Sequence, residues 1–159
     1  VGTDGPGGGK FKGSDALAAH VRQIWDKVTN GDSPYVVCTG GEPLLQLDVE
    51  LIDALHGVGF EIGVETNGTL VAPDGIDWIC VSPKSTAELL QRSGHELKLV
   101  YPQADAGPER FAALDFQHFF LQPMDNDRAS ENTVAATAYC LKNPQWRLSL
   151  QTHKLIGIP

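Results

Sequence analysis

The sequence has few cysteines, few basic residues and no long hydrophobic run. Its three cysteines, Cys38, Cys80 and Cys140, lie far apart and form no CxxC pair. An odd, widely spaced set argues against a disulfide framework and predicts no metal site. Lys and Arg number 12 against 20 Asp and Glu, and the formal net charge is −8. That charge argues against nucleic acid as the main partner.

No apolar run approaches the ~18 residues that a membrane span needs, so we expect no membrane partner. The polar, glycine-rich start shows no signal peptide, and the expected location is the cytoplasm. A chain of 159 residues with 42% hydrophobic residues suits a single domain, 1–159, with one core. Residues 1–13 read as a glycine-rich loop, and Val1 is not methionine. We therefore expect a processed, trimmed or partial chain.

Apolar residues recur with the periods of helices and strands along the rest of the sequence. The pattern predicts helices at 14–29, 45–56, 86–92, 108–114 and 130–142. It predicts strands at 35–38, 60–65, 76–81, 96–101, 118–122 and 146–151. The link 66–77 is too short and proline-broken for a helix. Strands that alternate with helices predict an α/β fold with a parallel sheet and right-handed crossovers.

Polar residues follow most of the predicted strands. Because the carboxyl ends of parallel strands meet at one edge of a sheet, these residues predict a common ligand site. Simpler interpretations remain for each: turns at Thr-Gly-Gly and Asn67-Gly68, a helix start at Ser82-Pro83, solvated carboxylates, and a structural His153. The residues concerned are 39–42, 65–67, 82–84, 122–125 and 151–153.

The TGGEP stretch, residues 39–43, suggests the kind of ligand. A glycine pair leaves the backbone open to close approach, and Glu42 can accept hydrogen bonds from an ammonium group. Ser82 and Lys84 offer a hydroxyl and a cation, which suit a ribose or a carboxylate. The predicted ligand is a nucleoside that bears an amino acid.

GGEP after the first strand resembles the motif with which radical S-adenosylmethionine enzymes hold the methionine amino group. Six segments together resemble 7-carboxy-7-deazaguanine synthase, in the right order over the whole chain. These segments are CTGGEPLLQ, VETNGT, WICVSPK, ELKLVYPQ, FFLQPMD and WRLSLQTHKLIGIP.

The resemblance implies a partial, modified TIM-like barrel and a carbon–nitrogen lyase. Such an enzyme converts 6-carboxy-5,6,7,8-tetrahydropterin to 7-carboxy-7-deazaguanine with release of ammonia, on the route to queuosine. It uses S-adenosylmethionine, a [4Fe-4S] cluster and Mg²⁺. A flavodoxin-type reductant and a homodimer are also implied.

The resemblance assigns roles to particular residues of this chain. Contacts to S-adenosylmethionine are implied for Gly41, Glu42, Ser82, Pro83, Lys84, Gln122, Pro123, Met124 and Asp125. Contacts to the pterin substrate are implied for Thr39, Pro159 and, by its place in the THK segment, His153.

One departure from the family concerns the cluster. Family members hold it with three cysteines of an N-terminal loop closed by a CxxC, followed by a magnesium-binding threonine. A segment like VGTDG comes shortly after, so we expect the first strand, those ligands and part of the pterin site to precede Val1. Cys38, Cys80 and Cys140 have the wrong spacing to replace them. This chain alone is therefore expected to be inactive.

Two alternatives stay open. One is a truncated, non-catalytic module that binds a nucleoside. The other is a radical enzyme of the glycyl-radical activating type, which shares GGEP but acts on a protein. The VETNGT, QPMD and THK segments favour the pterin enzyme over the second alternative.

Overall fold

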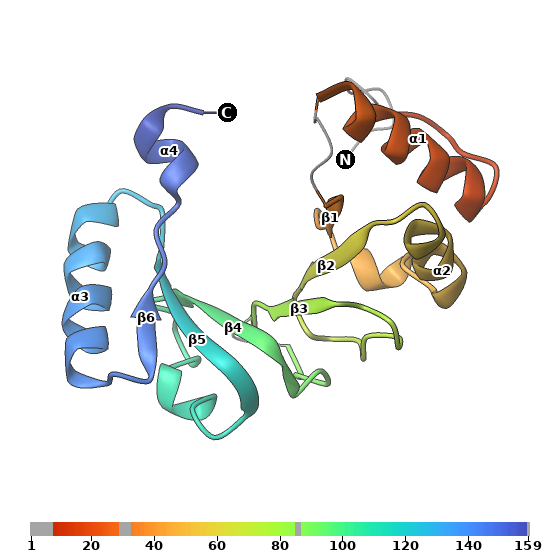
Figure 1. Ribbon diagram of the computed structural model, residues 1–159. Helices are drawn as coiled ribbons and strands as arrows, with labels where there is room; N and C mark the ends of the chain where they lie inside the picture. Colours follow the sequence, from red (N-terminus) through yellow and green to blue (C-terminus); the bar gives the residue numbers. More distant parts are fainter. Residues whose placement is uncertain (1–7, 29–32, 85–86, 159) are drawn as a thin grey trace. The chain divides into compact units, whose positions relative to one another are not determined.

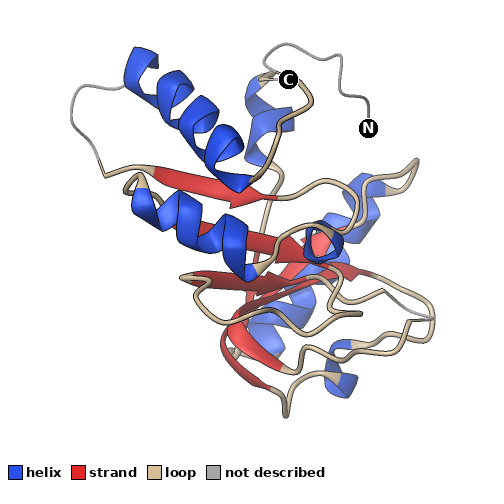
Figure 2. Cartoon of the chain, turned by 90° about the vertical axis from the view of Figure 1, so that its right-hand side faces the viewer, coloured by secondary structure: helices blue, strands red, loops and turns tan. Residues whose placement is uncertain are grey.

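A computed structural model describes residues 8–28, 33–84 and 87–158, along which strands alternate with helices and loops (Figures 1 and 2). The chain divides into two compact units, each described by itself below. The first comprises Val1–Thr66 and Val71–Ile79, and the second comprises Asn67–Leu70 and Cys80–Pro159. A single domain over 1–159 stays a prediction. In the described ranges, no helix is both long and apolar enough to cross a membrane.

The first unit contains the helices α1 (Ser14–Val28) and α2 (Val49–Gly57), the strands β1 (Tyr35–Cys38) and β2 (Glu61–Thr66), and the short 3-10 helix η1 (Pro43–Leu45). β1 pairs in parallel with β2, from Tyr35 opposite Glu61 to Cys38 opposite Val64.

The helix expected at 45–56 begins only at Val49, as α2, and Leu45 is instead the last residue of η1. The side chain of Asp48 accepts a hydrogen bond from the backbone N of Leu51 at 2.9 Å and caps α2. Such a cap supplies a partner for an amide at a helix start, so α2 begins after Asp48 rather than at residue 45.

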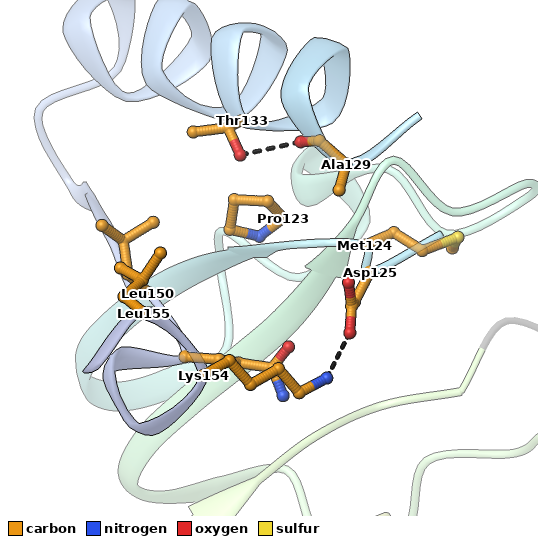
Figure 3. Close-up of a pocket in the computed structure, with 9 residues that line it drawn as sticks. Pro123, Met124, Asp125, Ala129, Thr133, Leu150, Lys154 and Leu155 are labelled. Atoms are coloured by element: carbon orange, nitrogen blue, oxygen red, sulfur yellow. Dashed lines mark hydrogen bonds and ion pairs between the residues drawn. The ribbon is translucent and has the colours of Figure 1, made fainter. Parts of the chain in front are cut away.

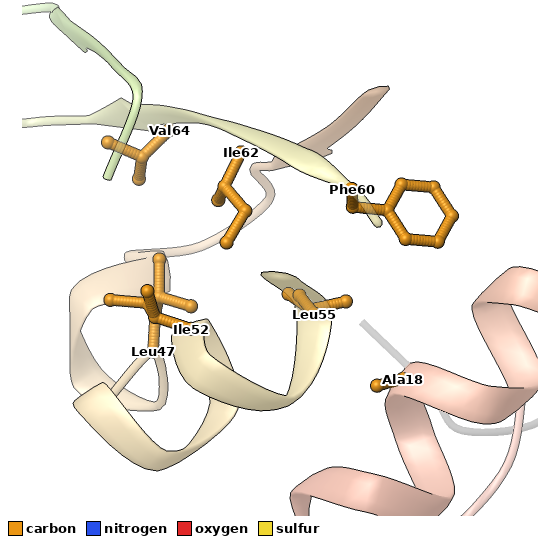
Figure 4. Packing of buried hydrophobic residues seen from close by; sticks show 7 residues of the cluster. All are labelled: Ala18, Leu47, Ile52, Leu55, Phe60, Ile62 and Val64. Carbon is orange, nitrogen blue, oxygen red and sulfur yellow. The ribbon is translucent and has the colours of Figure 1, made fainter. Parts of the chain in front are cut away.

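The core of the first unit lies between α2 and β2. Ile52 and Leu55 of α2 are 1% and 3% exposed, and they face Ile62 and Val64 of β2 (Figure 4). Burial of a side chain of this kind contributes about 1.5–3 kcal/mol. This packing holds β2 in place, and with it the residues at its carboxyl end.

The second unit contains the strands β3 (Trp78–Val81, whose last two residues belong to it), β4 (Ser93–Tyr101), β5 (Asp115–Pro123) and β6 (Trp146–Leu148). Its helices are η2 (Pro108–Arg110), α3 (Ala129–Lys142) and α4 (Thr152–Ile156). β4 pairs in parallel with both β3 and β5, and β5 pairs in parallel with β6. α3 contacts β5 and β6. The expected α/β class with parallel strands is confirmed.

Two expected helices are wrong. The described part of 86–92, residues 87–92, forms no helix, because the backbone N of Leu90 and of Gln91 both donate to Gly68 O, at 2.8 and 3.0 Å. These amides are thus bound to a distant segment instead of to a helical turn. The second, 108–114, shortens to η2 and a turn. The link 66–77 forms no helix, as expected.

The last strand also differs from its predicted bounds. Strand β6 ends at Leu148 instead of residue 151, and Gln151 is the residue that precedes α4. The backbone N of Ser149 still donates to Leu121 O at 2.8 Å, but the residues after it leave the sheet.

Candidate functional site

In the loop after β1, the backbone conformation requires a glycine at position 40 but not at position 41. Gly40 has φ +118°, a conformation that residues with a side chain rarely adopt. Gly41 has no such φ, and a Cβ added there would meet no heavy atom within 4 Å. The turn interpretation therefore explains Gly40. Gly41 leaves open space beside Glu42 that the fold itself does not require.

Glu42 is half-buried and is held by two other elements of the first unit. Its Oε1 accepts a hydrogen bond from the backbone N of Leu44, at 3.1 Å, and so caps η1. The same oxygen accepts from Thr66 Oγ1 at 2.7 Å, and Thr66 is only 2% exposed. An ionised carboxylate has about four acceptor positions on two oxygens, and these two hydrogen bonds both go to Oε1.

Thr39 belongs to the same group of side chains. Its Oγ1 donates to Glu65 Oε2 at 3.4 Å, and both residues are exposed. The parallel register places Cys38 opposite Val64, so the residues that follow each strand emerge at the same edge. Within this unit the structure therefore brings together Thr39 with Glu65 and Glu42 with Thr66.

The first predicted segment of the second unit, residues 82–84, directly follows β3. Pro83 is fully buried, whereas Ser82 is half-buried and Lys84 is exposed. Lys84 Nζ lies 3.5 Å from Ser82 Oγ. A buried proline between a hydroxyl and a cation anchors the segment and leaves both polar groups accessible to a ligand.

The next predicted segment, residues 122–125, begins in β5 and continues past its end. The backbone N of Met124 donates to Tyr101 O, and its O accepts from Asn132 Nδ2, both at 2.8 Å. Asn132 lies on α3 and is 6% exposed. Its buried amide thus fixes the backbone of this segment. Sequence reasoning missed this role, because Asn132 reads as an ordinary helical residue.

A pocket of about 130 Å³, partly open to solvent, lies beside the same segment in the second unit (Figure 3). Asp125 and Lys154 form an ion pair at the pocket, and Leu150 and Leu155 supply apolar contacts. The pocket is lined by Pro123, Met124, Asp125, Ala129, Thr133, Leu150, Gln151, Lys154 and Leu155.

The structure does not place His153 in the lining of this pocket. His153 lies on α4, is exposed, and is not among the lining residues, whereas its neighbour Lys154 is. Pro159 lies outside the described residues. The sequence signal for Lys154 is only that it follows His153 in the THK segment.

The cysteines do not fit an iron–sulfur cluster. Burial raises the pKa of the Cys38 thiol, and burial likewise raises the pKa of the Cys140 thiol. A cluster ligand must instead be a thiolate, which a raised pKa disfavours. Within 8–28, 33–84 and 87–158, no three or more His, Cys, Asp or Glu side chains gather to hold a metal ion.

A parallel α/β fold with polar residues after its strands defines a class of proteins that bind ligands at strand ends. No protein-family model matches the chain. Three curated relatives share the name 7-carboxy-7-deazaguanine synthase. The one from Bradyrhizobium diazoefficiens is 61% identical over 158 residues, which cover 99% of this chain and 74% of the relative. The relatives from Caulobacter vibrioides and Bordetella pertussis are 62% and 60% identical, and each match covers 100% of this chain and 75% of the relative.

A solved structure is also similar to this chain. The crystal structure of QueE from Escherichia coli superposes with a TM-score of 0.64 at 27% identity, over 87% of this chain and 63% of that one. The chain belongs to the 7-carboxy-7-deazaguanine synthase family and spans about three quarters of the length of these curated relatives. The expected fold, an α/β partial TIM-like barrel, is confirmed. The two alternative functions are not favoured.

Proposed function

We propose that this chain supplies the S-adenosylmethionine subsite and part of the pterin subsite of a 7-carboxy-7-deazaguanine synthase. The reaction is the ring contraction of 6-carboxy-5,6,7,8-tetrahydropterin with loss of ammonia. The observation that carries the proposal is the half-buried Glu42 carboxylate, held in one orientation beside the open space at Gly41.

The first unit provides the contact to the methionine part. The ammonium group donates to the Glu42 carboxylate, a charge-assisted hydrogen bond of the stronger kind. Gly41 allows the ligand to approach the backbone, because no side chain covers it. S-adenosylmethionine supplies the radical chemistry of the reaction when it is bound, and the residues of this chain bind and orient it.

For two segments of the second unit, cofactor contacts rest on the family resemblance. Ser82 and Lys84 offer a hydroxyl and a cation to the ribose and the methionine carboxylate, on either side of the buried Pro83. Gln122, Pro123, Met124 and Asp125 form the other cofactor segment. The backbone hydrogen bonds of Met124 to Tyr101 and Asn132 make that segment rigid.

The pterin contacts and the wider assembly rest on the family resemblance. Thr39 offers an exposed hydroxyl, and His153 and Pro159 belong to the tail that the family directs to its substrate. A [4Fe-4S] cluster and Mg²⁺ are the further cofactors that the family resemblance implies. A flavodoxin-type reductant, a homodimer and a cytoplasmic location complete the proposal.

Glu42→Gln in the full-length protein tests the cofactor subsite. Glutamine keeps an oxygen that accepts from Leu44 N and Thr66 Oγ1, but it removes the negative charge that receives the ammonium. The affinity for S-adenosylmethionine should fall by ~1.5–3 kcal/mol, as measured by calorimetry. Glu61→Gln is the matched control, since Glu61 is exposed at the amino end of β2. If Glu42→Gln and Glu61→Gln bind S-adenosylmethionine with equal affinity, Glu42 does not belong to the subsite.

A further inference from the structure

The hydroxyl of Thr66 is a buried polar group with a specific partner. Thr66 is the last residue of β2, and it shares the buried face of the strand with Val64, whereas Glu65 between them is exposed. Buried polar groups in folded proteins are almost always hydrogen-bonded. Here the hydroxyl donates to Glu42 Oε1 at 2.7 Å, across 24 residues of sequence.

Two donors from two elements meet at that one oxygen. The Leu44 amide approaches Glu42 Oε1 from η1 at 3.1 Å, and the Thr66 hydroxyl approaches it from β2 at 2.7 Å. Together they restrict the rotation of the carboxylate and set the direction of Oε2. A side chain that is already ordered loses less conformational entropy when a ligand binds.

We propose that Thr66 is a positioning residue for S-adenosylmethionine, acting through Glu42. Its hydroxyl holds the Glu42 carboxylate in the orientation that receives the methionine ammonium. This inference rests on the proposed function of Glu42. The competing interpretation is structural, in which the hydroxyl of Thr66 only stabilises the end of β2 and the loop after β1.

Two pairs of variants in the full-length protein isolate the hydroxyl. Thr66→Val keeps the size of the side chain and removes its donor, while Thr66→Ser keeps the donor. Thr66→Ala and Thr66→Ser both lack the methyl group and differ only in the hydroxyl. The second pair therefore decides the question even if Thr66→Val fails to fold. Thr137→Val is the matched control, since its hydroxyl donates to Thr133 O within α3.

Two ligands separate positioning from a structural effect. S-adenosylmethionine carries the ammonium group, and 5′-methylthioadenosine lacks the whole amino-acid part. We expect Thr66→Val and Thr66→Ala to raise the Kd of S-adenosylmethionine about tenfold, which corresponds to ~1.4 kcal/mol. The Kd of 5′-methylthioadenosine should stay within about twofold, and Thr66→Ser should bind both ligands as the unaltered protein does.

The combination with Glu42→Gln separates this inference from the proposed function. If Glu42→Gln weakens binding and the loss of the Thr66 hydroxyl does not, Thr66 has no positioning role and the proposed function stands. If Glu42→Gln has no effect, both fall. An equal loss of affinity for both ligands would show a structural role instead. The proposal also predicts the double variant: adding Thr66→Val to Glu42→Gln should weaken S-adenosylmethionine binding little further, because the two residues act through one contact.

Discussion

Alanine at position 41 introduces a methyl group at the proposed cofactor subsite with little expected effect on the fold. The added Cβ meets no heavy atom within 4 Å, and the backbone of Gly41 is not in the left-handed region. The folded state should therefore accept the change. Because alanine restricts the unfolded chain more than glycine does, the free energy of unfolding should rise by about 0.4–1 kcal/mol.

The same methyl group should impair cofactor binding. In the proposed subsite the ligand approaches the backbone where the methyl would lie. Insertion of a methyl into a packed interface costs typically ~1–3 kcal/mol. The Kd of S-adenosylmethionine should therefore rise about 5- to 150-fold in Gly41→Ala. The predicted signature is a variant that is at least as stable as the unaltered protein and binds the cofactor poorly.

Two other glycines of the first unit serve as controls in the same calorimetric and urea-unfolding measurements. Gly57, at the end of α2, has the same open space, so Gly57→Ala should leave the Kd unchanged. Gly40 has φ +118°, so Gly40→Ala should lower the free energy of unfolding by ~1–3 kcal/mol. A Gly41→Ala protein with unaltered affinity for S-adenosylmethionine would refute the reasoning.

Three further predictions concern other parts of the chain. His56 Nε2 lies 2.9 Å from Asp77 Oδ2, and this hydrogen bond lowers the pKa of Asp77. The contribution of the ionised Asp77 to the stability of the fold should be complete above the ordinary carboxyl pKa of ~3.9. It should be lost as the pH falls through the lowered pKa of Asp77 in the folded protein. Asp77→Asn should thus cost ~0.2–1 kcal/mol in urea unfolding at pH 7 and less at pH 3, and an equal cost at both would contradict this. Gly68→Ala should lower the free energy of unfolding by at least ~1–3 kcal/mol, since its Cβ would lie 2.5 Å from Leu89 Cδ1 at φ +77°, and unchanged stability would rule out this packing. Lys154→Met should change that free energy by less than about 1 kcal/mol, because its ion pair with Asp125 is exposed, and a larger loss would show a buried contact.

The parallel fold could be predicted because its strands carry their signal locally. Leu99 and Leu121 are fully buried, and each lies in a short apolar run bounded by polar or turn residues. The Asn67-Gly68 pair likewise predicts a turn from the sequence alone. Gly68 adopts φ +77°, a conformation typical of such a turn.

The helix expected at 86–92 is absent from its described residues for a long-range reason. Residues 87–92 have a composition that a helix would tolerate, but two of their amides donate to Gly68 O. No periodicity within those residues indicates a partner about twenty positions earlier. The same limit applies to Asn132, whose amide supports Met124, and to Lys154, which pairs with Asp125. In each case the contact depends on how the strands bring distant segments together.

Glu42 shows why a structural and a functional interpretation of one residue need not compete. In the sequence it reads either as a solvated loop carboxylate or as the acceptor of an ammonium group. In the structure it caps η1 and accepts from Thr66, which is a structural role. Those two hydrogen bonds also remove the rotational freedom that a solvated carboxylate would lose on binding. The structural contacts of Glu42 thus prepare it for the proposed ligand, and replacing their donors should affect the affinity for that ligand.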